Sequence, residues 1–76
     1  MESSASALDL KVLSVMGRRI RALREAKGWS QEKLAEVAEI HDRTVGRIER
    51  GEFNFSVSIF RRLCHALACR AEDVWR

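Results

Sequence analysis

The spacing of the apolar residues is the feature that most limits how this chain can fold. Large apolar side chains recur every three or four positions along most of the sequence, as at Leu13, Met16, Ile20 and Leu23. This is the period of one face of an α-helix. No stretch alternates apolar and polar residues as a half-buried strand does, and the chain has no proline. The pattern predicts an all-α domain.

Capping residues and glycines divide this pattern into five short helices. Ser30 and Ser56 are typical N-caps, because a serine hydroxyl accepts a hydrogen bond from a free backbone N–H of the first turn. Gly28 and Gly51 are typical of helix ends, since glycine adopts the left-handed conformation without strain. The predicted helices span residues 8–26, 31–38, 42–50, 57–68 and 71–75.

The same spacing predicts which side chains form the core. Trp29 is expected to fill the space between helices, and Val45 and Ile48 are the only large apolar residues of the third helix. The second helix is expected to turn Leu34, Val37 and Ala38 inward, and the fourth Val57, Phe60, Leu63, Cys64 and Leu67.

A chain of 76 residues is enough for one small domain. We expect residues 8–76 to form it and residues 1–7 to be a flexible N-terminus. A domain of this size buries only about 60% of its unfolded surface, so a partner chain is a useful source of stability. No apolar run approaches the ~20 residues of a membrane span, and the N-terminus lacks the features of a secretory signal. We therefore expect a cytoplasmic protein without membrane contact.

The two cysteines, Cys64 and Cys69, are expected to be reduced apolar side chains. Their spacing exceeds one helical turn, which disfavours the Cα separation that a disulfide requires. Together with His65 they match no common zinc pattern. We expect neither a metal nor a cofactor.

The predicted third helix has an unusual outer face. On a helical wheel with about 100° per residue, Val45 and Ile48 point inward. A glycine among the outer residues is expected to let a large surface come close to the backbone. The outer side carries Arg43, Arg47 and Arg50, with Asp42 and Gly46 beside them.

Two helices joined by the short turn Glu39-Ile40-His41, the second with donors on its outer face, form the helix-turn-helix arrangement that places a helix in the DNA major groove. Arginines alone are also compatible with a solvated charged face. The capped second helix, the short turn and the basic first helix together favour DNA binding, which fits the net charge of +3.

Three segments, IRALREAKG, SQEKLA and RIERG, resemble the helix-turn-helix domain of the phage lambda repressor and Cro group, known as the XRE family. The resemblance extends over about residues 10–75 and implies a compact five-helix lambda-repressor-like domain. Within the family, DRT followed by RIERG, with Asn54 and Ser56 after it, is similar to the small controller proteins of restriction–modification systems.

The resemblance implies base contacts on the third helix. Arg43 and Arg47 fit this role because arginine binds guanine in a bidentate manner, and Thr44 fits it because a threonine methyl contacts thymine. Asp42 falls at a contact position as well, but it is equally suited to cap the helix.

The resemblance also implies contacts that position the domain without specifying sequence. Arg24 and Glu49 are implied to form a structural salt bridge between the first and third helices. Phosphate contacts are implied for Gln31, which opens the second helix, and for Arg19, Arg50 and Asn54.

Three positions depart from the family pattern. Glu39 and Ala68 stand where glycine is usual, and Phe55 where proline is common. A left-handed Glu39 would cost roughly 1–2 kcal/mol; the alternative is a different turn, which leaves the angle of the third helix open. Phe53 and Phe55 are compatible with a lid on the core, an interface or contacts to DNA sugars, and we favour the lid or the interface.

These features lead us to expect a sequence-specific regulator of transcription that binds double-stranded DNA as a homodimer on a palindromic operator. The dimer interface is expected at Val74, Trp75 and parts of the fourth helix. We expect no effector domain after the fifth helix, and therefore no small-molecule ligand. Autoregulation fits both a restriction–modification controller and a phage repressor.

Other classes of function fit less well. The sequence lacks the serine, histidine and carboxylate patterns and the glycine-rich loops of enzymes, and a domain of this size has little room for a substrate pocket. RNA binding is disfavoured because no aromatic stacking surface is evident. A protein-interaction module, such as an antitoxin or an adaptor, is the alternative, but it has little need for Arg43, Gly46 and Arg47 together.

Overall fold

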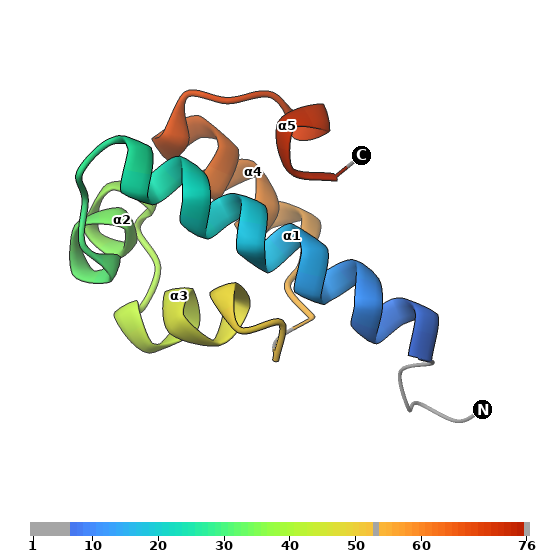
Figure 1. The fold of residues 1–76 in the computed structure, drawn as a ribbon. Helices are drawn as coiled ribbons and strands as arrows, with labels where there is room; N and C mark the ends of the chain where they lie inside the picture. Colours follow the sequence, from blue (N-terminus) through green and yellow to red (C-terminus); the bar gives the residue numbers. More distant parts are fainter. Residues whose placement is uncertain (1–6, 53, 76) are drawn as a thin grey trace.

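The computed structural model describes residues 7–52 and 54–75, which form five helices and, within these ranges, no strand (Figure 1). The all-α class is confirmed, and each helix boundary lies within one residue of its predicted position. None of the helices in this part of the chain is long and apolar enough to cross a membrane. The helices are α1 (Ala7–Ala26), α2 (Gln31–Ala38), α3 (Asp42–Glu49), α4 (Val57–Leu67) and α5 (Ala71–Trp75).

Helix α1 runs through the whole molecule, and its first turns extend beyond the other helices (Figure 1). It contacts α3 on one side and α4 and α5 on the other, while α2 packs against both α3 and α4. Every helix supplies at least one fully buried side chain to a single core. These side chains are Ile20, Leu34, Val45, Ile48, Leu63 and Val74.

Two predicted core residues are wrong. Val37 is exposed on α2, because Leu34, Ala35 and Ala38 form the stripe that faces the core and Val37 lies outside it. Val57 is 82% exposed, because it is the first residue of α4 and lies at the rim of the core. Trp29 is half-buried and packs against the core, as predicted for a residue between helices.

Side chains cap three of the helices at their N-termini. The hydroxyls of Ser30 and Ser56 accept hydrogen bonds from backbone N–H groups of α2 and α4 at 3.0 and 3.2 Å, as predicted. At α3 the cap is His41, whose Nδ1 accepts from the N–H of Arg43 at 3.1 Å. The alternative of Asp42 as the N-cap is therefore wrong, because the histidine already occupies that position.

The four longer helices end in the same hydrogen-bonded turn, in which one residue takes the left-handed conformation and two N–H groups bond back to carbonyls of the last turn. The left-handed residue is a glycine after α1 and α3, as predicted: Gly28 and Gly51. After α2 and α4 it is Glu39 and Ala68. Glu39 has φ 61° and ψ 46°, so the turn before α3 has the shape that suits glycine. Its carbonyl also accepts a hydrogen bond from Arg62 Nη1 of α4 at 3.0 Å.

Glycine at these two positions should stabilise the protein. We expect Glu39→Gly and Ala68→Gly each to raise the free energy of unfolding by about 1 kcal/mol, since the left-handed cost of roughly 1–2 kcal/mol exceeds the extra chain entropy of glycine. Urea denaturation followed by circular dichroism measures the change. Glu36→Gly, at an exposed position inside α2, is the matched control and should lose about 1 kcal/mol. Equal losses at all three positions would contradict the expectation.

The turn at the end of α4 places the two cysteines together. Ala68 has φ 54° and reverses the chain, and the N–H of Cys69 donates to the carbonyl of Cys64 at 3.0 Å. Both residues are free thiols and half-buried, as predicted for reduced core side chains. The sequence argument counted their spacing along a helix, but α4 ends at Leu67 and the chain turns back before Cys69.

Candidate nucleic-acid interface

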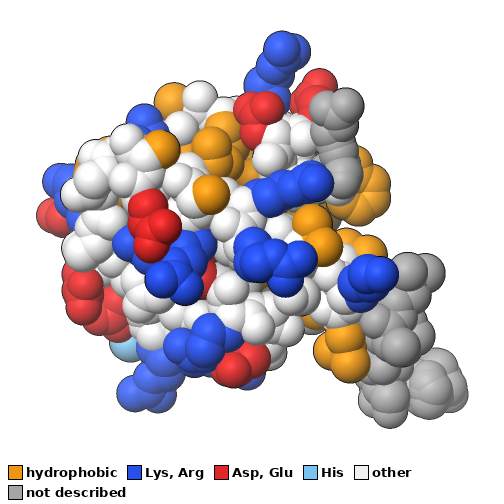
Figure 2. Space-filling view, in the orientation of Figure 1, with side chains coloured by type: hydrophobic (Ala, Val, Ile, Leu, Met, Phe, Trp, Pro, Cys, Tyr) orange, Lys and Arg blue, Asp and Glu red, His pale blue; other side chains and the backbone are white. Residues whose placement is uncertain are grey.

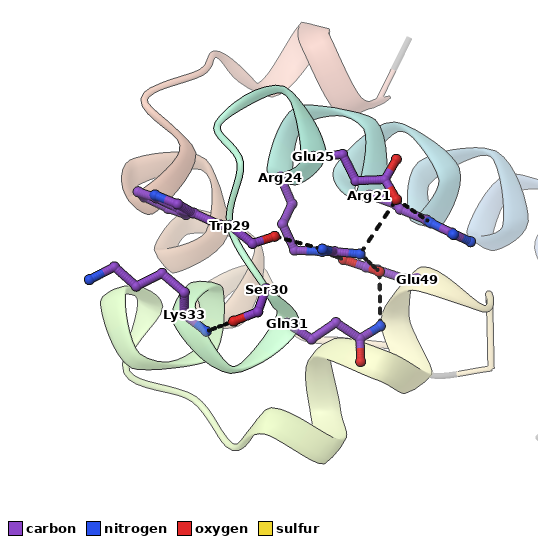
Figure 3. Close-up of polar contacts among 8 residues, drawn as sticks. All are labelled: Arg21, Arg24, Glu25, Trp29, Ser30, Gln31, Lys33 and Glu49. Atoms are coloured by element: carbon purple, nitrogen blue, oxygen red, sulfur yellow. Dashed lines mark hydrogen bonds and ion pairs between the residues drawn. The ribbon is translucent and has the colours of Figure 1, made fainter.

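A buried ion pair joins α1 to α3. Arg24 Nε lies 2.6 Å from Glu49 Oε2, and Arg24 Nη2 lies 3.0 Å from Glu49 Oε1 (Figure 3). The two residues are only 9% and 7% exposed. The hydrogen bond to Glu49 raises the pKa of Arg24 above its ordinary value, against the opposing effect of burial. A bidentate pair of this kind fixes the geometry between two helices.

The same ion pair extends to the beginning of α2. Arg24 Nη1 donates to the carbonyl oxygen of Trp29 at 2.7 Å, and Gln31 Nε2 donates to Glu49 Oε1 at 3.0 Å (Figure 3). Trp29 and Gln31 lie on either side of the N-cap Ser30. Within the described ranges, no buried side-chain nitrogen or oxygen lacks a hydrogen-bond partner. One ion pair therefore positions α3 against both α1 and the start of α2.

Gly17 allows α1 and α3 to approach each other closely. A Cβ at this position would lie 2.8 Å from the carbonyl oxygen of Glu49, and closer still to that of Ile48. Sequence analysis did not single out this residue. The signal that points to it is a glycine in the middle of α1, where glycine costs about 1 kcal/mol relative to alanine.

The outer face of α3 is exposed and basic. Arg43, Arg47 and Arg50 are exposed, Thr44 is half-buried, and Val45 and Ile48 lie in the core, as the helical wheel predicted. Figure 2 shows that Lys and Arg side chains gather over α3 and the neighbouring part of α1, with only a few acidic side chains among them. This face therefore attracts an anionic partner.

Gly46 does not leave an open gap on this face. It is buried, and a Cβ there would lie 3.2 Å from Arg50 Nη1 and 3.4 Å from Gln31 Oε1. The expectation that Gly46 admits an approaching surface is wrong, because the side chains of Gln31 and Arg50 already fill that space. Instead, Gly46 allows Arg50 to fold back along α3 toward the start of α2.

A hollow of about 230 Å³ lies between the beginnings of α2 and α3. Four residues predicted from the sequence as DNA contacts line it: Gln31, Asp42, Arg43 and Arg50. The other four predicted contacts lie outside it: Arg19, Thr44, Arg47 and Asn54. Asn54 lies farther away, at the start of α4. The lining residues are Gln31, Glu32, Asp42, Arg43, Gly46 and Arg50.

A second, mostly apolar hollow of about 340 Å³ lies between the N-terminal half of α1, the start of α4 and α5. Val57 and Trp75, which is 61% exposed, lie at its edge. Phe55 packs against the core with its ring centroid 6.1 Å from that of Phe60, so it forms the predicted lid. Phe53 lies outside the described residues.

Val74 does not belong to any exposed surface. It is fully buried in the core of its own chain, where α5 packs against α1. The prediction that Val74 forms part of a dimer interface is therefore wrong, because its side chain cannot contact a second molecule.

The described residues also contain no group of three or more His, Cys, Asp or Glu side chains able to hold a metal ion.

Comparisons with known proteins agree with this geometry. Residues 15–74 match a family model described as a helix-turn-helix domain. The chain is 35% identical to the uncharacterised helix-turn-helix-type transcriptional regulator YgzD of Bacillus subtilis, covering 79% of this chain and 91% of YgzD. It is 33% identical to the control protein C.SmaI of Serratia marcescens, over 79% of this chain and 69% of that protein.

The fold is also similar to the solved structures of a controller protein and of a gene regulator. The restriction–modification controller protein C.AhdI from Aeromonas hydrophila superposes with a TM-score of 0.79 at 39% sequence identity, covering 82% of this chain and 94% of C.AhdI. The clp gene regulator ClgR from C. glutamicum gives a TM-score of 0.80 at 28% identity, covering 84% and 82% of the two chains.

Proposed function

The chain belongs to the XRE-type helix-turn-helix family of DNA-binding transcriptional regulators, and we propose that it binds a palindromic operator as a homodimer. The observation that carries the proposal is the outer face of α3. Its arginines are exposed, and the helix itself is fixed against α1 by the buried ion pair of Arg24 and Glu49. A charged face without a binding role has no need of such fixed geometry. Its site of action is the cytoplasm, and we propose no catalytic activity.

Base recognition is assigned to the N-terminal half of α3 and to Arg47. Arg43 and Arg47 would bind guanine, and Thr44 would contact a thymine methyl. Asp42 lies beside Arg43 in the hollow at the start of α3. Its carboxylate would accept a hydrogen bond from a cytosine amine or orient that arginine.

Phosphate contacts are assigned around this surface, to Gln31, Arg19, Arg50 and Asn54. An amide NH₂ group has two donors, and Gln31 uses one of them on Glu49, so the other is assigned to a phosphate. Arg50 pairs with Glu52 at 3.1 Å, but both side chains are exposed. Exposed pairs of this kind contribute little, so a DNA phosphate would replace Glu52.

The second copy of the chain is assigned to the apolar hollow beside α5. Large apolar side chains are exposed around it, on α1, α4 and α5, and an exposed apolar patch is typical of an interface. A two-fold axis places the same patch of both protomers together, so an apolar surface complements itself. Dimerisation would also supply the second half-site that tight, specific binding by so small a domain requires.

Substitution of the α3 arginines tests the site. Arg43→Ala and Arg47→Ala are each expected to weaken operator binding by about 1–3 kcal/mol and to relax the preference at one base position. Selection from a random duplex library at two salt concentrations, followed by titration of the selected site, measures both effects. Arg70→Ala, on the α4–α5 connection far from α3 (Figure 1), removes the same charge and should leave the consensus unchanged. An unaltered consensus in both α3 variants, or no consensus at all, would refute the proposal.

The dimer is tested at the apolar hollow. Trp75→Asp and Val57→Asp put a charge on the proposed interface without disturbing the core, because both side chains are largely exposed. Sedimentation equilibrium should show dimers for the unaltered chain and monomers for the two variants, and the selected operator should be palindromic. A monomeric unaltered chain at high micromolar concentration would refute the dimer but not the α3 site.

The likeness to C.SmaI and C.AhdI supports a controller-like role in which the protein regulates its own gene. A phage-repressor-like role makes the same prediction about autoregulation. A match to the selected consensus upstream of the gene for this chain would support it. A consensus that occurs only elsewhere would leave the DNA-binding function intact and refute autoregulation.

A further inference from the structure

The end of α4 brings two thiols into contact, and the proposed DNA-binding function uses neither of them. The N–H of Ala68 donates to the carbonyl of His65 at 3.1 Å, and that of Cys69 donates to the carbonyl of Cys64 at 3.0 Å. In this turn the side chains of the first and last residues frequently pack against each other, and here the two thiols interact. Those two residues are Cys64 and Cys69, and they are the only cysteines of the chain.

The two thiols are not equivalent. Burial raises both pKa values, that of Cys64 to about 12. The charge of Cys69 and the hydrogen bond between the two sulfurs raise the pKa of Cys64 further, whereas the hydrogen bond opposes the rise at Cys69. Around Cys69, Asp73 also raises the pKa of the thiol and Lys27 lowers it. Cys69 is therefore the sulfur on which a negative charge is better tolerated.

We propose that Cys64 and Cys69 form a dithiol site that a low-molecular-weight disulfide, such as oxidised glutathione, converts to an intramolecular disulfide. The cross-link would tie the last turn of α4 to the connection that leads into α5. This inference does not depend on the proposed DNA binding.

The reaction is an ordinary thiol–disulfide exchange in two steps. The Cys69 thiolate attacks one sulfur of the small disulfide, whose S–S bond breaks and releases one thiol. Cys64 then gives up its proton and attacks the Cys69 sulfur of the mixed disulfide, which releases the second thiol. The protein loses two electrons and two protons, and the small disulfide gains both. Burial slows the reaction, because it opposes the thiolate, but it does not oppose the uncharged disulfide that results.

The position of the pair gives the cross-link a structural consequence. Both cysteines pack against the core, and the residues that follow them form α5, which buries Val74 and exposes Trp75. A bond between Cys64 and Cys69 would hold the left-handed turn at Ala68 closed. The attachment of α5 would therefore become stronger under oxidising conditions and weaker under reducing ones.

Mass spectrometry of the whole chain tests the site. The protein is incubated with oxidised and reduced glutathione at mildly alkaline pH, quenched with N-ethylmaleimide and weighed, both folded and in guanidinium chloride. Two thiols on one short segment have an effective concentration on the order of millimolar or more. We expect the folded chain to lose two hydrogens and take up no maleimide. The equilibrium constant for disulfide formation should be at least about tenfold larger in the folded chain than in denaturant. Its unfolding temperature should rise and return to the starting value with dithiothreitol.

Single-cysteine variants complete the test. Cys64→Ser keeps the thiol that attacks first and should accumulate the glutathione adduct, whereas Cys69→Ser should form it several-fold more slowly. Any one of three outcomes would overturn the proposal: a stable mixed disulfide in the unaltered chain, a disulfide between two chains, or equal formation of the cross-link with and without denaturant.

Discussion

Arg24→Ala is expected to lower the free energy of unfolding by about 3–5 kcal/mol, the usual cost of removing one partner from a buried ion pair. The variant leaves the carboxylate of Glu49 buried with only Gln31 as a donor, and it removes the donor of the Trp29 carbonyl. Small domains have total stabilities near the lower end of about 5–15 kcal/mol. Urea denaturation at 25 °C should therefore show a variant that is largely unfolded or close to it.

Two further variants separate the buried pair from an ordinary surface charge. Arg21 also pairs with a glutamate, Glu25 at 3.0 Å, but both side chains are exposed, so Arg21→Ala should cost less than about 1 kcal/mol. Replacing Arg24 by Met and Glu49 by Leu together should restore most of the stability, because two apolar side chains need no partner. Equal losses in Arg21→Ala and Arg24→Ala would contradict the structural role of the buried pair.

The double variant also separates folding from function. Without Glu49, the amide of Gln31 has no acceptor to orient it, and the end of α3 is no longer anchored to Arg24. We expect such a protein to be folded and yet to bind its operator more weakly than the unaltered chain. Operator titration at fixed salt measures the difference.

Gly17→Ala is expected to lower the free energy of unfolding by about 1–3 kcal/mol or more, as overpacking of a close contact does. The added methyl meets the backbone carbonyl oxygens of Ile48 and Glu49, which have no side-chain rotation available to avoid it. Helix propensity alone predicts the opposite sign, a gain of about 1 kcal/mol. Denaturation therefore decides between the two effects, and operator affinity should fall as well, because α3 has to shift away from α1.

Gly46→Ala is the matched control within the same interface. Its methyl would meet only the ends of two flexible side chains, Arg50 and Gln31, which can move aside. We expect its stability to be unchanged or slightly higher. If Gly17→Ala proved as stable as Gly46→Ala, this would contradict the close approach of α1 to α3 at Gly17.

The helices were predictable because their signals are local. Ser30, Gly28 and Gly51 act through hydrogen bonds and dihedral angles within a few residues, so their effect does not depend on the rest of the fold. The failures occurred where a neighbouring helix decides. Val37 and Val57 have helical spacing suited to burial, but the positions of α3, α4 and α1 leave them outside the core.

The candidate site was predictable to a similar degree. Helical period is enough to place Arg43 and Arg47 on one face, because Val45 and Ile48 must point inward. The proximity of Gln31 to Glu49 and to Gly46 arises from how α2 and α3 cross. Burial of Val74 likewise depends on α5 returning to α1, which no local pattern encodes.

The separation between the buried ion pair and the exposed arginines has an evolutionary consequence. A change at position 24 or 49 alone passes through a poorly folded intermediate, so these two positions can drift only as a pair. Arg43 and Arg47 are exposed on the outer face of α3 and are not part of this buried pair, so their positions can change without leaving a buried charge unpaired. On the proposed assignment of these positions to base contacts, a lineage of such proteins could therefore acquire new operators by single mutations while the buried pair stays unchanged.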